Sequence, residues 1–246
     1  MKILGIIPAR YASSRFPGKP LVEIKGKSMI QRVYEQSKRA ELLTDLVVAT
    51  DDERIYEHVI DFGGKAVMTS TEHQSGTDRC LEALQKNKNN FDVVINIQGD
   101  EPFIDPSQIT DLINCFEDKD TDIATLVKKV HHADELDSSS MVKVVINKRD
   151  QAMYFSRSII PYIYGAPREE WISHFDYYEH VGIYGYSTKV LEEITKLPVS
   201  KLEKLEKLEQ LRWLENGYTV KVAYTDVESE PIDTPEDLER ILKRMA

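Results

Sequence analysis

Residues 3–19 read ILGIIPARYASSRFPGK, an apolar run that leads into a loop of cations and small residues. A run of isoleucine, leucine and glycine that ends at a proline is typical of a strand buried on both faces of a parallel sheet. The loop offers positive charges and hydroxyl groups from Arg10, Ser13, Ser14, Arg15 and Lys19. Such a loop after a first strand indicates a phosphate-binding site, so we expect a polyanionic ligand.

This loop matches neither of the two common nucleotide-binding patterns. It contains no GxxxxGK[ST] and no GxGxxG, which disfavours a P-loop ATPase and a dehydrogenase. Taken alone, the loop is equally compatible with a solvated basic turn. Further motifs decide between these two interpretations.

Composition sets the class of protein. The 246 residues are 41% hydrophobic and 30% charged, which suits a globular chain, and we expect one domain over residues 1–246. No apolar run reaches the length of a membrane span and no basic-plus-apolar leader opens the chain, so we expect a cytoplasmic protein without membrane contact. The net charge of −10 disfavours binding to nucleic acid, which needs a broad basic face.

Apolar runs alternate with amphipathic segments along the first half of the chain. Strands are predicted at residues 46–49, 66–68, 93–97 and 123–130, with helices at 29–40, 53–62, 78–86 and 106–116. This alternation predicts an α/β fold with a mostly parallel central sheet flanked by helices. Ligands of such sheets bind beyond the carboxyl ends of the strands, so residues 10–19 and 98–102 should face one crevice.

The second half is less regular. Strands predicted at residues 142–146, 181–186 and 219–224 suggest a smaller β layer that acts as a lid. Residues 201–211 repeat Lys-Leu-Glu and predict one helix with an apolar stripe of Leu202, Leu205, Leu208 and Leu211. This stripe indicates a core or subunit contact, and the charges between the leucines indicate solvated surface.

Carboxylates stand at two positions that suit a metal ion. NIQGDEP at residues 96–102 ends an apolar strand in a turn, where Asp100 is the leading Mg²⁺ ligand, because Mg²⁺ binds through few carboxylates and completes its shell with water and phosphate. The alternative is a plain turn that uses Gly and Asp for backbone geometry. Asp233 precedes Thr234 and Pro235, residue types that cap and open a helix, so its carboxylate is available to a site.

Three other motifs are compatible with ligand binding, each with a structural alternative. HQSGTDR at residues 73–79 offers backbone amides and Arg79 to a base or phosphate, or it is a simple helix cap. HVGIYGY at residues 180–186 contains His180 and Tyr184, although a lone histidine near a strand is usually structural. YFSR at residues 154–157 presents Arg157 to a carboxylate or to an ordinary ion pair. No GxSxG or HExxH motif supports a covalent hydrolase or a zinc protease.

Taken together, these segments resemble the 3-deoxy-manno-octulosonate (Kdo) cytidylyltransferases, or CMP-Kdo synthetases. The matching segments, in the family's order, are IIPARYASSRFPGKPL, VATDD, HQSGTDR, NIQGDEP, VKVV, YFSRSIIP, GIYGY, LEQLR and DTPEDLE. The resemblance implies a Rossmann-like nucleotide-diphospho-sugar transferase fold. It also implies that the anomeric 2-hydroxyl of Kdo attacks the α-phosphate of CTP, with Mg²⁺ as cofactor, to give CMP-Kdo and pyrophosphate for lipopolysaccharide synthesis. A homodimer is implied as well.

The same resemblance assigns roles to residues. Nucleotide binding is implied for Ala9, Arg10, Ser13, Ser14, Arg15, Lys19, Gln74, Ser75, Gly76, Arg79 and Gln98. Catalytic roles are implied for Arg15, Lys19 and Asp100, and metal binding for Asp100 and Asp233. Sugar binding is implied for Arg157, His180, Tyr184, Glu209 and Gln210. For Glu209 this replaces the surface position that the Lys-Leu-Glu repeat predicts.

Two alternatives stay open at this point. The substrate could be a related acidic sugar, 8-amino-8-deoxy-Kdo or a nonulosonate. Sialic acid cytidylyltransferases share the fold but usually carry a different first loop, so PARYASSRFPGK disfavours them. A catalytically silent nucleotide-binding regulator is the other alternative, and the intact Arg15, Lys19, Asp100 and Asp233 argue against it.

Overall fold

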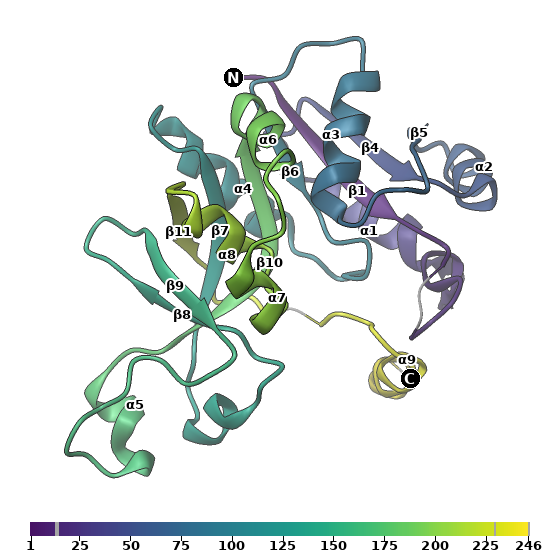
Figure 1. The fold of residues 1–246 in the computed structure, drawn as a ribbon. Helices are drawn as coiled ribbons and strands as arrows, with labels where there is room; N and C mark the ends of the chain where they lie inside the picture. Colours follow the sequence, from purple (N-terminus) through teal and green to yellow (C-terminus); the bar gives the residue numbers. More distant parts are fainter. Residues whose placement is uncertain (13–14, 229, 246) are drawn as a thin grey trace. The chain divides into compact units, whose positions relative to one another are not determined.

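The computed structural model describes residues 1–12, 15–228 and 230–245. The chain divides into two compact units (Figure 1). The first unit contains Met1–Thr110 and Glu228–Ala246, and the second contains Asp111–Val227. The division falls within helix α4, Pro106–Asn114. The expectation of one domain over residues 1–246 stays a prediction.

The first unit contains a parallel sheet of four strands in the order β6-β1-β4-β5. Their bounds are Ile3–Ala9 for β1, Asp45–Thr50 for β4, Ala66–Met68 for β5 and Val93–Asn96 for β6. Strands β1, β4 and β6 are almost entirely buried, which is the reason for their continuous apolar sequences. A short hairpin, β2 (Glu23–Ile24) and β3 (Lys27–Ser28), lies outside this sheet.

Helices connect these strands. Their bounds are Met29–Ser37 for α1, Glu53–Asp61 for α2 and Gly76–Lys86 for α3, and each begins at a residue that accepts a hydrogen bond from the first turn: Ser28, Asp52 and Ser75. Right-handed crossovers place α1 and α2 on one face of the sheet. Helix α3 carries the chain back past β1 to β6 and packs on the other face, in front of the sheet in Figure 1.

The carboxyl-terminal segment belongs to the first unit. Thr234 and Asp237 form a capping box at the start of α9, Pro235–Arg244. Ile232 and Ile241 are buried in a cluster with Ile24 and Met29. Phe16, from the loop after β1, packs against the same cluster. This apolar contact fixes both the first loop and the segment that contains Asp233.

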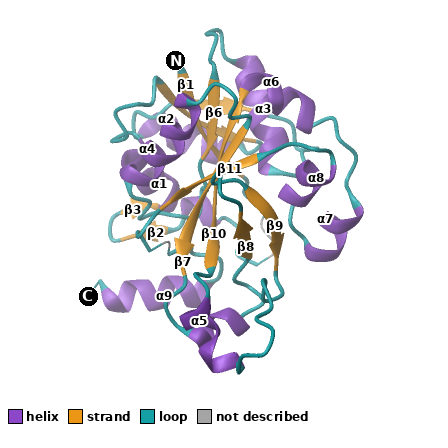
Figure 2. Ribbon diagram, turned by 90° about the vertical axis from the view of Figure 1, so that its left-hand side faces the viewer, coloured by secondary structure: helices purple, strands orange, loops and turns teal. Residues whose placement is uncertain are grey.

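The second unit is a mixed sheet. Strand β7 (Ile123–Lys129) pairs in parallel with β11 (Val220–Tyr224) and antiparallel with β10 (Tyr178–Ser187). On the other side of β10, strand β8 (Lys143–Ile146) pairs with it, and β9 (Ala152–Ser156) pairs with β8 (Figure 2). The short helix α5, Trp171–His174, precedes β10, and α6, Thr188–Ile194, follows it.

The predicted helix over residues 201–211 is wrong as a single element. Helix α7 spans Lys201–Glu206, Lys207 takes a left-handed conformation with a φ of 55°, and α8 spans Gln210–Glu215. The apolar stripe is therefore broken: Leu205 is 76% exposed, whereas Leu208 is buried. Lys, Leu and Glu all favour helices, so the Lys-Leu-Glu repeat gives no sign that the helix ends before Lys207.

The other predicted elements agree with the structure to within a few residues. The fold is of the expected α/β class, with a parallel sheet in the first unit. The second half contains the expected β strands. Their role as a lid stays a prediction. Strand β9 and helix α6 were not predicted as elements. Within the described residues, no helix has the length and apolar character needed to cross a bilayer.

Candidate active site

A pocket lies in the first unit, beyond the carboxyl ends of β1 and β6. The predicted nucleotide and metal residues that line it are Ala9, Arg10, Arg15, Lys19, Gln74, Ser75, Gly76, Arg79, Gln98, Asp100 and Asp233. Ser13 and Ser14 lie outside the described residues. The structure thus brings together segments separated by more than two hundred positions, as the rule for parallel sheets requires.

Two aspartates and two cations form the charged centre of this pocket. The ammonium of Lys19 lies 2.8 Å from Asp100 Oδ2 and 3.1 Å from Asp233 Oδ1. The guanidinium of Arg15 lies 3.2 Å from Asp233 Oδ2. The Lys19 side chain is 14% exposed and that of Arg15 is 66% exposed. Lys19 is therefore the inner cation and Arg15 the outer one.

Backbone geometry explains why the two aspartates meet. A Cβ atom at Gly99 would lie 2.8 Å from the carbonyl oxygen of Pro8, so only glycine allows this turn to approach β1. The N–H of Ile232 donates to the carbonyl of Asp100 at 2.9 Å, which brings Asp233 alongside. Capping of α9 uses Thr234 and Asp237, which leaves the Asp233 carboxylate facing the pocket.

The donor set of this centre suits magnesium. Asp100 and Asp233 converge on one cation, the Lys19 ammonium, and their oxygens are hard ligands of the type that Mg²⁺ binds. Among the described residues, no group of three or more His, Cys, Asp and Glu side chains forms a cage for a metal. Two carboxylates with room for phosphate and water match Mg²⁺ rather than a fully protein-coordinated ion.

The first loop is held by contacts that the sequence did not reveal. The N–H of Gly18 donates to the carbonyl of Tyr11 at 2.9 Å, and Gly18 has a φ of 72° with the Tyr11 ring against it. The Arg54 guanidinium stacks on the same ring, 3.3 Å from its centroid, and pairs with Asp52. Tyr11 and Arg54 therefore fix the base of the loop that carries Arg15.

The amino terminus of α3 forms another wall. Ser75 caps this helix through the N–H of Asp78, Gly76 opens it, and both residues line the pocket, so the positive end of the helix lies at this wall. Arg79 is almost fully buried and donates to Thr69 Oγ1 at 2.6 Å and to Asp51 Oδ2 at 2.7 Å. Two of the Arg79 donors are thus used within the protein. The side chain links α3 to Thr69 and Asp51, whether or not it also contacts a ligand.

His73 also lines the pocket, although the sequence singled out its neighbours instead. Its Nε2 atom makes a short contact with Glu82, which also accepts from the N–H of Ser70. Burial raises the pKa of Glu82, but hydrogen bonds from Lys86, Ser70 and His73 together lower it to about 2. Glu82 is therefore an anion that orders the loop from Ser70 to His73.

The second unit contains a different kind of site, built from aromatic rings. The His180 ring lies 5.2 Å from the Tyr184 ring and 5.1 Å from the Phe155 ring, measured between centroids. The Tyr184 ring is 5.1 Å from Trp213, which belongs to α8. Burial lowers the pKa of His180 to about 3. Burial raises the pKa of Tyr184, and the nearby Tyr186 and Glu209 raise it further.

Polar atoms within this aromatic site have no partner in the described part of the chain. They are the hydroxyl of Tyr184 and the Nε2 amide of Gln210, and both side chains are buried. A buried polar atom without a hydrogen bond costs free energy, so each such atom calls for an explanation. The two atoms belong to residues for which the sequence implied sugar binding.

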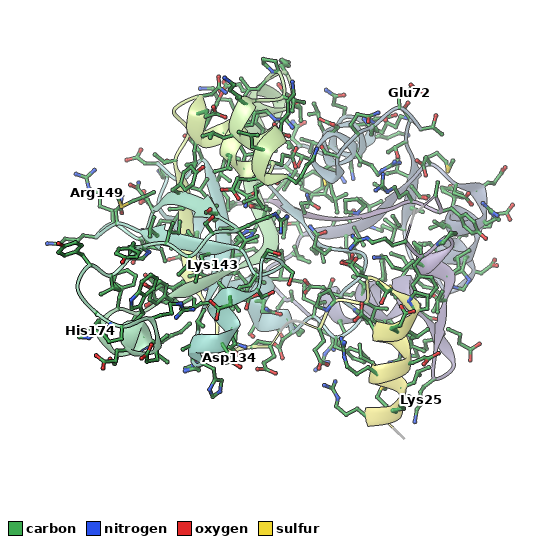
Figure 3. All side chains as sticks on the ribbon, turned by 60° about the horizontal axis from the view of Figure 1, so that its bottom comes forward. Lys25, Glu72, Asp134, Lys143, Arg149 and His174 are labelled. Atoms are coloured by element: carbon green, nitrogen blue, oxygen red, sulfur yellow. The ribbon has the colours of Figure 1, made fainter. Side chains whose placement is uncertain are left out.

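Arg157 lies at the end of β9 and is held by backbone carbonyls. Its Nε donates to the carbonyl of Glu206 at 2.7 Å, and its Nη1 donates to that of Ser139 at 2.9 Å. Buried Lys143, which Figure 3 shows inside the second unit, donates from Nζ to the carbonyl of Arg157 at 2.9 Å. Lys143 had no predicted role of its own. The guanidinium keeps other N–H groups for a carboxylate ligand.

The break between α7 and α8 positions the remaining predicted residues. Glu206 ends α7 and accepts from Ser156 Oγ and from the N–H of Arg157. Gln210 then begins α8, which packs against β9. Arg212 lies 3.4 Å from Glu209. The break at Lys207 thus lets Glu206 bond to the end of β9 and lets α8, which begins at Gln210, pack against the same strand.

The fold and the charged pocket define a nucleotide-binding α/β enzyme, because cations, a helix amino terminus and paired carboxylates meet at the carboxyl ends of parallel strands. The family model for cytidylyltransferases matches residues 4–228. The 3-deoxy-manno-octulosonate cytidylyltransferase of Parabacteroides distasonis is 57% identical over 250 residues, which cover 100% of this chain and 99% of the relative. That of Bacteroides thetaiotaomicron is 60% identical over 242 residues, which cover 97% and 96%.

Solved structures agree with these relatives. The structure of CMP:2-keto-3-deoxy-manno-octonic acid synthetase complexed with CTP matches with a TM-score of 0.92 and 42% identity, covering 100% of this chain and 98% of that one. A 4-diphosphocytidyl-2C-methyl-D-erythritol synthase from Anaerococcus prevotii, at a TM-score of 0.63 and 14% identity, shares the fold alone. The chain belongs to the cytidylyltransferase family and, within it, to the 3-deoxy-manno-octulosonate cytidylyltransferases.

Proposed function

We propose that the chain activates Kdo with CTP and releases CMP-Kdo and pyrophosphate. The oxygen of the anomeric 2-hydroxyl forms the new bond to the α-phosphorus and loses its proton, while the bond to the β-phosphate breaks. The observation that carries this proposal is the convergence of Arg15, Lys19, Asp100 and Asp233 on one pocket, in a chain whose full-length relatives bear this name.

The first unit supplies charge stabilisation for the nucleotide. Lys19 is partly buried and can follow the negative charge that builds up on the phosphates, and Arg15 is exposed enough to reach the departing pyrophosphate. Arg10 and the amides at the start of α3 extend the anion-binding surface, and the Gln98 amide offers contacts to the base. In such phosphoryl transfers, positioning and electrostatics supply most of the catalysis.

Asp100 and Asp233 would hold Mg²⁺. Bound Mg²⁺ would neutralise phosphate charge and lower the pKa of the attacking hydroxyl, so that no protein base is required. In the described structure the Lys19 ammonium holds the two carboxylates on one point, which keeps them oriented toward the pocket. Lys19 therefore acts both on the phosphates and on the metal ligands.

The second unit supplies recognition of the sugar. Arg157 is placed to pair with the Kdo carboxylate through the guanidinium N–H groups that the backbone does not use. The Tyr184 hydroxyl, the Gln210 amide, His180 and Glu209 are placed to bind sugar hydroxyls. The partnerless polar atoms of Tyr184 and Gln210 support this assignment, because a polyol satisfies them.

Three finer points belong to the same proposal. We infer a homodimer, a cytoplasmic location and a role in supplying lipopolysaccharide synthesis, as the family resemblance implies. Sedimentation of the full chain tests the dimer: a single species at the monomer mass at micromolar concentration contradicts it.

The function is tested by pyrophosphate release. We expect Mg²⁺-dependent release from CTP with Kdo, and little release when ATP, GTP or UTP replaces CTP. Parallel reactions contain 8-amino-8-deoxy-Kdo or N-acetylneuraminate in place of Kdo. Preference for either sugar would keep the nucleotidyl transfer but reassign the substrate, and no release with any pair would contradict the catalytic proposal.

A further inference from the structure

Thr125 lies in the middle of β7 and is completely buried. Its hydroxyl oxygen lies 3.0 Å from His180 Nε2, 2.7 Å from the carbonyl oxygen of Ile183 and 3.2 Å from that of Val181. One side chain of β7 thus contacts three residues of the neighbouring strand β10. Nothing in the sequence distinguishes Thr125 from an ordinary strand residue.

These contacts span an irregularity in β10. Val181 pairs with Leu126, but the next pair along the ladder is Tyr184 with Thr125, so Gly182 and Ile183 have no opposite residue. Residues four positions apart in a regular strand are roughly 13 Å apart, at about 3.3 Å per residue. The bulge shortens this separation, and the rings of His180 and Tyr184 lie only 5.2 Å apart.

The positions of the hydrogen atoms follow from the contacts. Thr125 has one hydroxyl proton, and carbonyl oxygens only accept, so the 2.7 Å contact with the Ile183 oxygen requires that Thr125 donate there. Its oxygen is then an acceptor for His180, whose Nε2 must carry a proton. A neutral imidazole has one N–H, so Nδ1 carries a lone pair.

His180 is neutral at neutral pH, because burial lowers its pKa to about 3. Desolvation is the cause of that shift, and no carboxylate offsets it. The residue as a whole is half-buried. The neutral ring therefore offers an acceptor and no second donor.

We propose that Thr125 is a positioning residue of the sugar site: it holds the β10 bulge that places His180 beside Tyr184, and it fixes His180 as the Nε2–H tautomer, whose Nδ1 accepts a hydrogen bond from a hydroxyl group of the sugar. The identity of the ligand rests on the proposed function. The tautomer of His180 and the bulge in β10 follow from the contacts of Thr125 and are independent of that function.

The first test uses the wild-type protein with ¹⁵N-labelled histidine rings. We expect the His180 ring to show its proton on Nε2 and a pyridine-like Nδ1. Addition of Kdo should change the Nδ1 resonance and leave Nε2 protonated. A proton on Nδ1 in the wild type would overturn the proposal, and this arm needs no variant that folds poorly.

The second test uses Thr125→Val, which keeps the shape of the side chain and removes the hydroxyl, and Thr125→Ser, which keeps the hydroxyl. We expect Thr125→Val to populate both tautomers and to raise the KM for Kdo about 10-fold, the effect of one lost hydrogen bond in the site. The KM for CTP should change less than about twofold. Thr125→Ser should restore the Nε2–H tautomer and most of the affinity for Kdo.

Thr195→Val is the matched control, because the Thr195 hydroxyl donates only to helix carbonyls of the second unit. It should leave both KM values and the His180 spectrum unchanged. An unchanged KM for Kdo and an unchanged tautomer in Thr125→Val would reject the positioning role. If the wild type shows the expected tautomer but no turnover with Kdo, the proposed function fails while the geometry of His180 stands.

Discussion

The candidate sites of the two units are built from different kinds of side chain. In the first unit, the pocket is lined by ions that pair with one another and remain partly exposed, such as Arg15 with Asp233 and Lys19 with Asp100. In the second unit, aromatic rings surround His180 and Tyr184, and the buried Tyr184 hydroxyl has no partner among the described residues. On the proposed assignment, the triphosphate meets charges that water screens only in part, whereas the sugar meets buried hydrogen-bonding groups together with the guanidinium of Arg157.

The difference has an energetic consequence for the protein without substrate. The outer pair of Arg15 and Asp233 is exposed, and such pairs contribute little to folding, typically below about 1 kcal/mol. A buried polar atom without a partner costs about 1–3 kcal/mol. The unsatisfied Tyr184 hydroxyl and Gln210 amide therefore reduce the stability of the free protein, and on the proposed assignment binding of the sugar would recover that free energy. Removing a charge from the first pocket should therefore lower activity with little change in stability, whereas removing an unsatisfied hydroxyl from the aromatic site should weaken sugar binding without lowering stability.

The largest expected effect belongs to Asp100→Asn. Loss of this charge removes a ligand for Mg²⁺ and a partner of Lys19, so turnover should fall by about 1,000-fold or more. The melting temperature should stay close to that of the wild type, since the pair is partly exposed. Steady-state pyrophosphate release and thermal unfolding measure the two quantities.

Asp176→Asn is the control for Asp100→Asn, because Asp176 forms an exposed pair with Lys129 and lines no pocket described above. It should leave turnover unchanged. Wild-type-like rates of Asp100→Asn at saturating Mg²⁺ would remove Asp100 from the metal site and would end the contrast between an ionic and an aromatic site.

His180 should make the stability of the chain depend on pH. Its pKa is about 3 in the folded protein and near 6.5 when unfolded, so between these values the unfolded state binds more protons. Stability is then complete above pH 6.5 and falls as the pH is lowered toward 3. From pH 7 to pH 5 the free energy of unfolding should drop by up to about 2 kcal/mol on this account.

Urea unfolding of the wild type and of His180→Gln at both pH values isolates this contribution, because all other groups titrate in both proteins. The drop should be smaller in the variant by the amount due to His180. Equal pH dependence of the two proteins would show that His180 is hydrated and would contradict a dry sugar site.

Sequence patterns predicted the first unit better than the second. Continuous apolar runs identify buried parallel strands, and the cationic loop at residues 10–19 follows the first of them, so the anion site could be expected. The meeting of Asp100 with Asp233 could not, because it depends on the contact of Ile232 with the Asp100 carbonyl, across more than 130 positions. Only the family resemblance connected these two residues.

The sugar site depends on irregular backbone that has little local signal. The bulge after Val181 and the left-handed Lys207 are set by packing, and a repeat of Lys-Leu-Glu masks the break at Lys207. Lys143 stands in a run that reads as an ordinary strand, yet its ammonium donates to three backbone carbonyls. A lysine of this kind cannot be distinguished from a surface lysine without the tertiary structure.

Tyr184→Phe should separate binding from stability. Removing a hydroxyl that has no partner among the described residues should leave stability unchanged or raise it by about 1 kcal/mol. The same change should raise the KM for Kdo about 10-fold and leave the KM for CTP unchanged. Chemical denaturation and initial rates measure the two effects.

Tyr177→Phe is the matched control for Tyr184→Phe. The Tyr177 hydroxyl donates to the carbonyl of Pro161 at 2.6 Å, so its removal should destabilise the second unit by about 1 kcal/mol. It should not change the KM for Kdo. A loss of stability in Tyr184→Phe as large as that in Tyr177→Phe would mean that the Tyr184 hydroxyl is satisfied within the protein, and the energetic contrast between the sites would fail.

The smallest expected effect belongs to Arg54→Gln in the first unit. Its guanidinium stacks on Tyr11 and pairs with Asp52, but it is exposed, so water weakens both contacts. The loop keeps its other restraints, the Gly18 to Tyr11 hydrogen bond and the packing of Phe16. The ratio kcat/KM for CTP should therefore fall only about threefold.

Arg39→Gln is the control for Arg54→Gln, since Arg39 follows the end of α1, donates to the side chain of Gln36 and does not line the nucleotide pocket. It should leave kcat/KM unchanged. The effect of Arg54→Gln should persist at high salt better than that of Arg15→Gln, because a stacked cation positions the loop whereas Arg15 meets the phosphates directly. Equal salt dependence of the two variants would mean that Arg54 acts as a further phosphate-binding charge, and that the loop is held by the backbone and Phe16 alone.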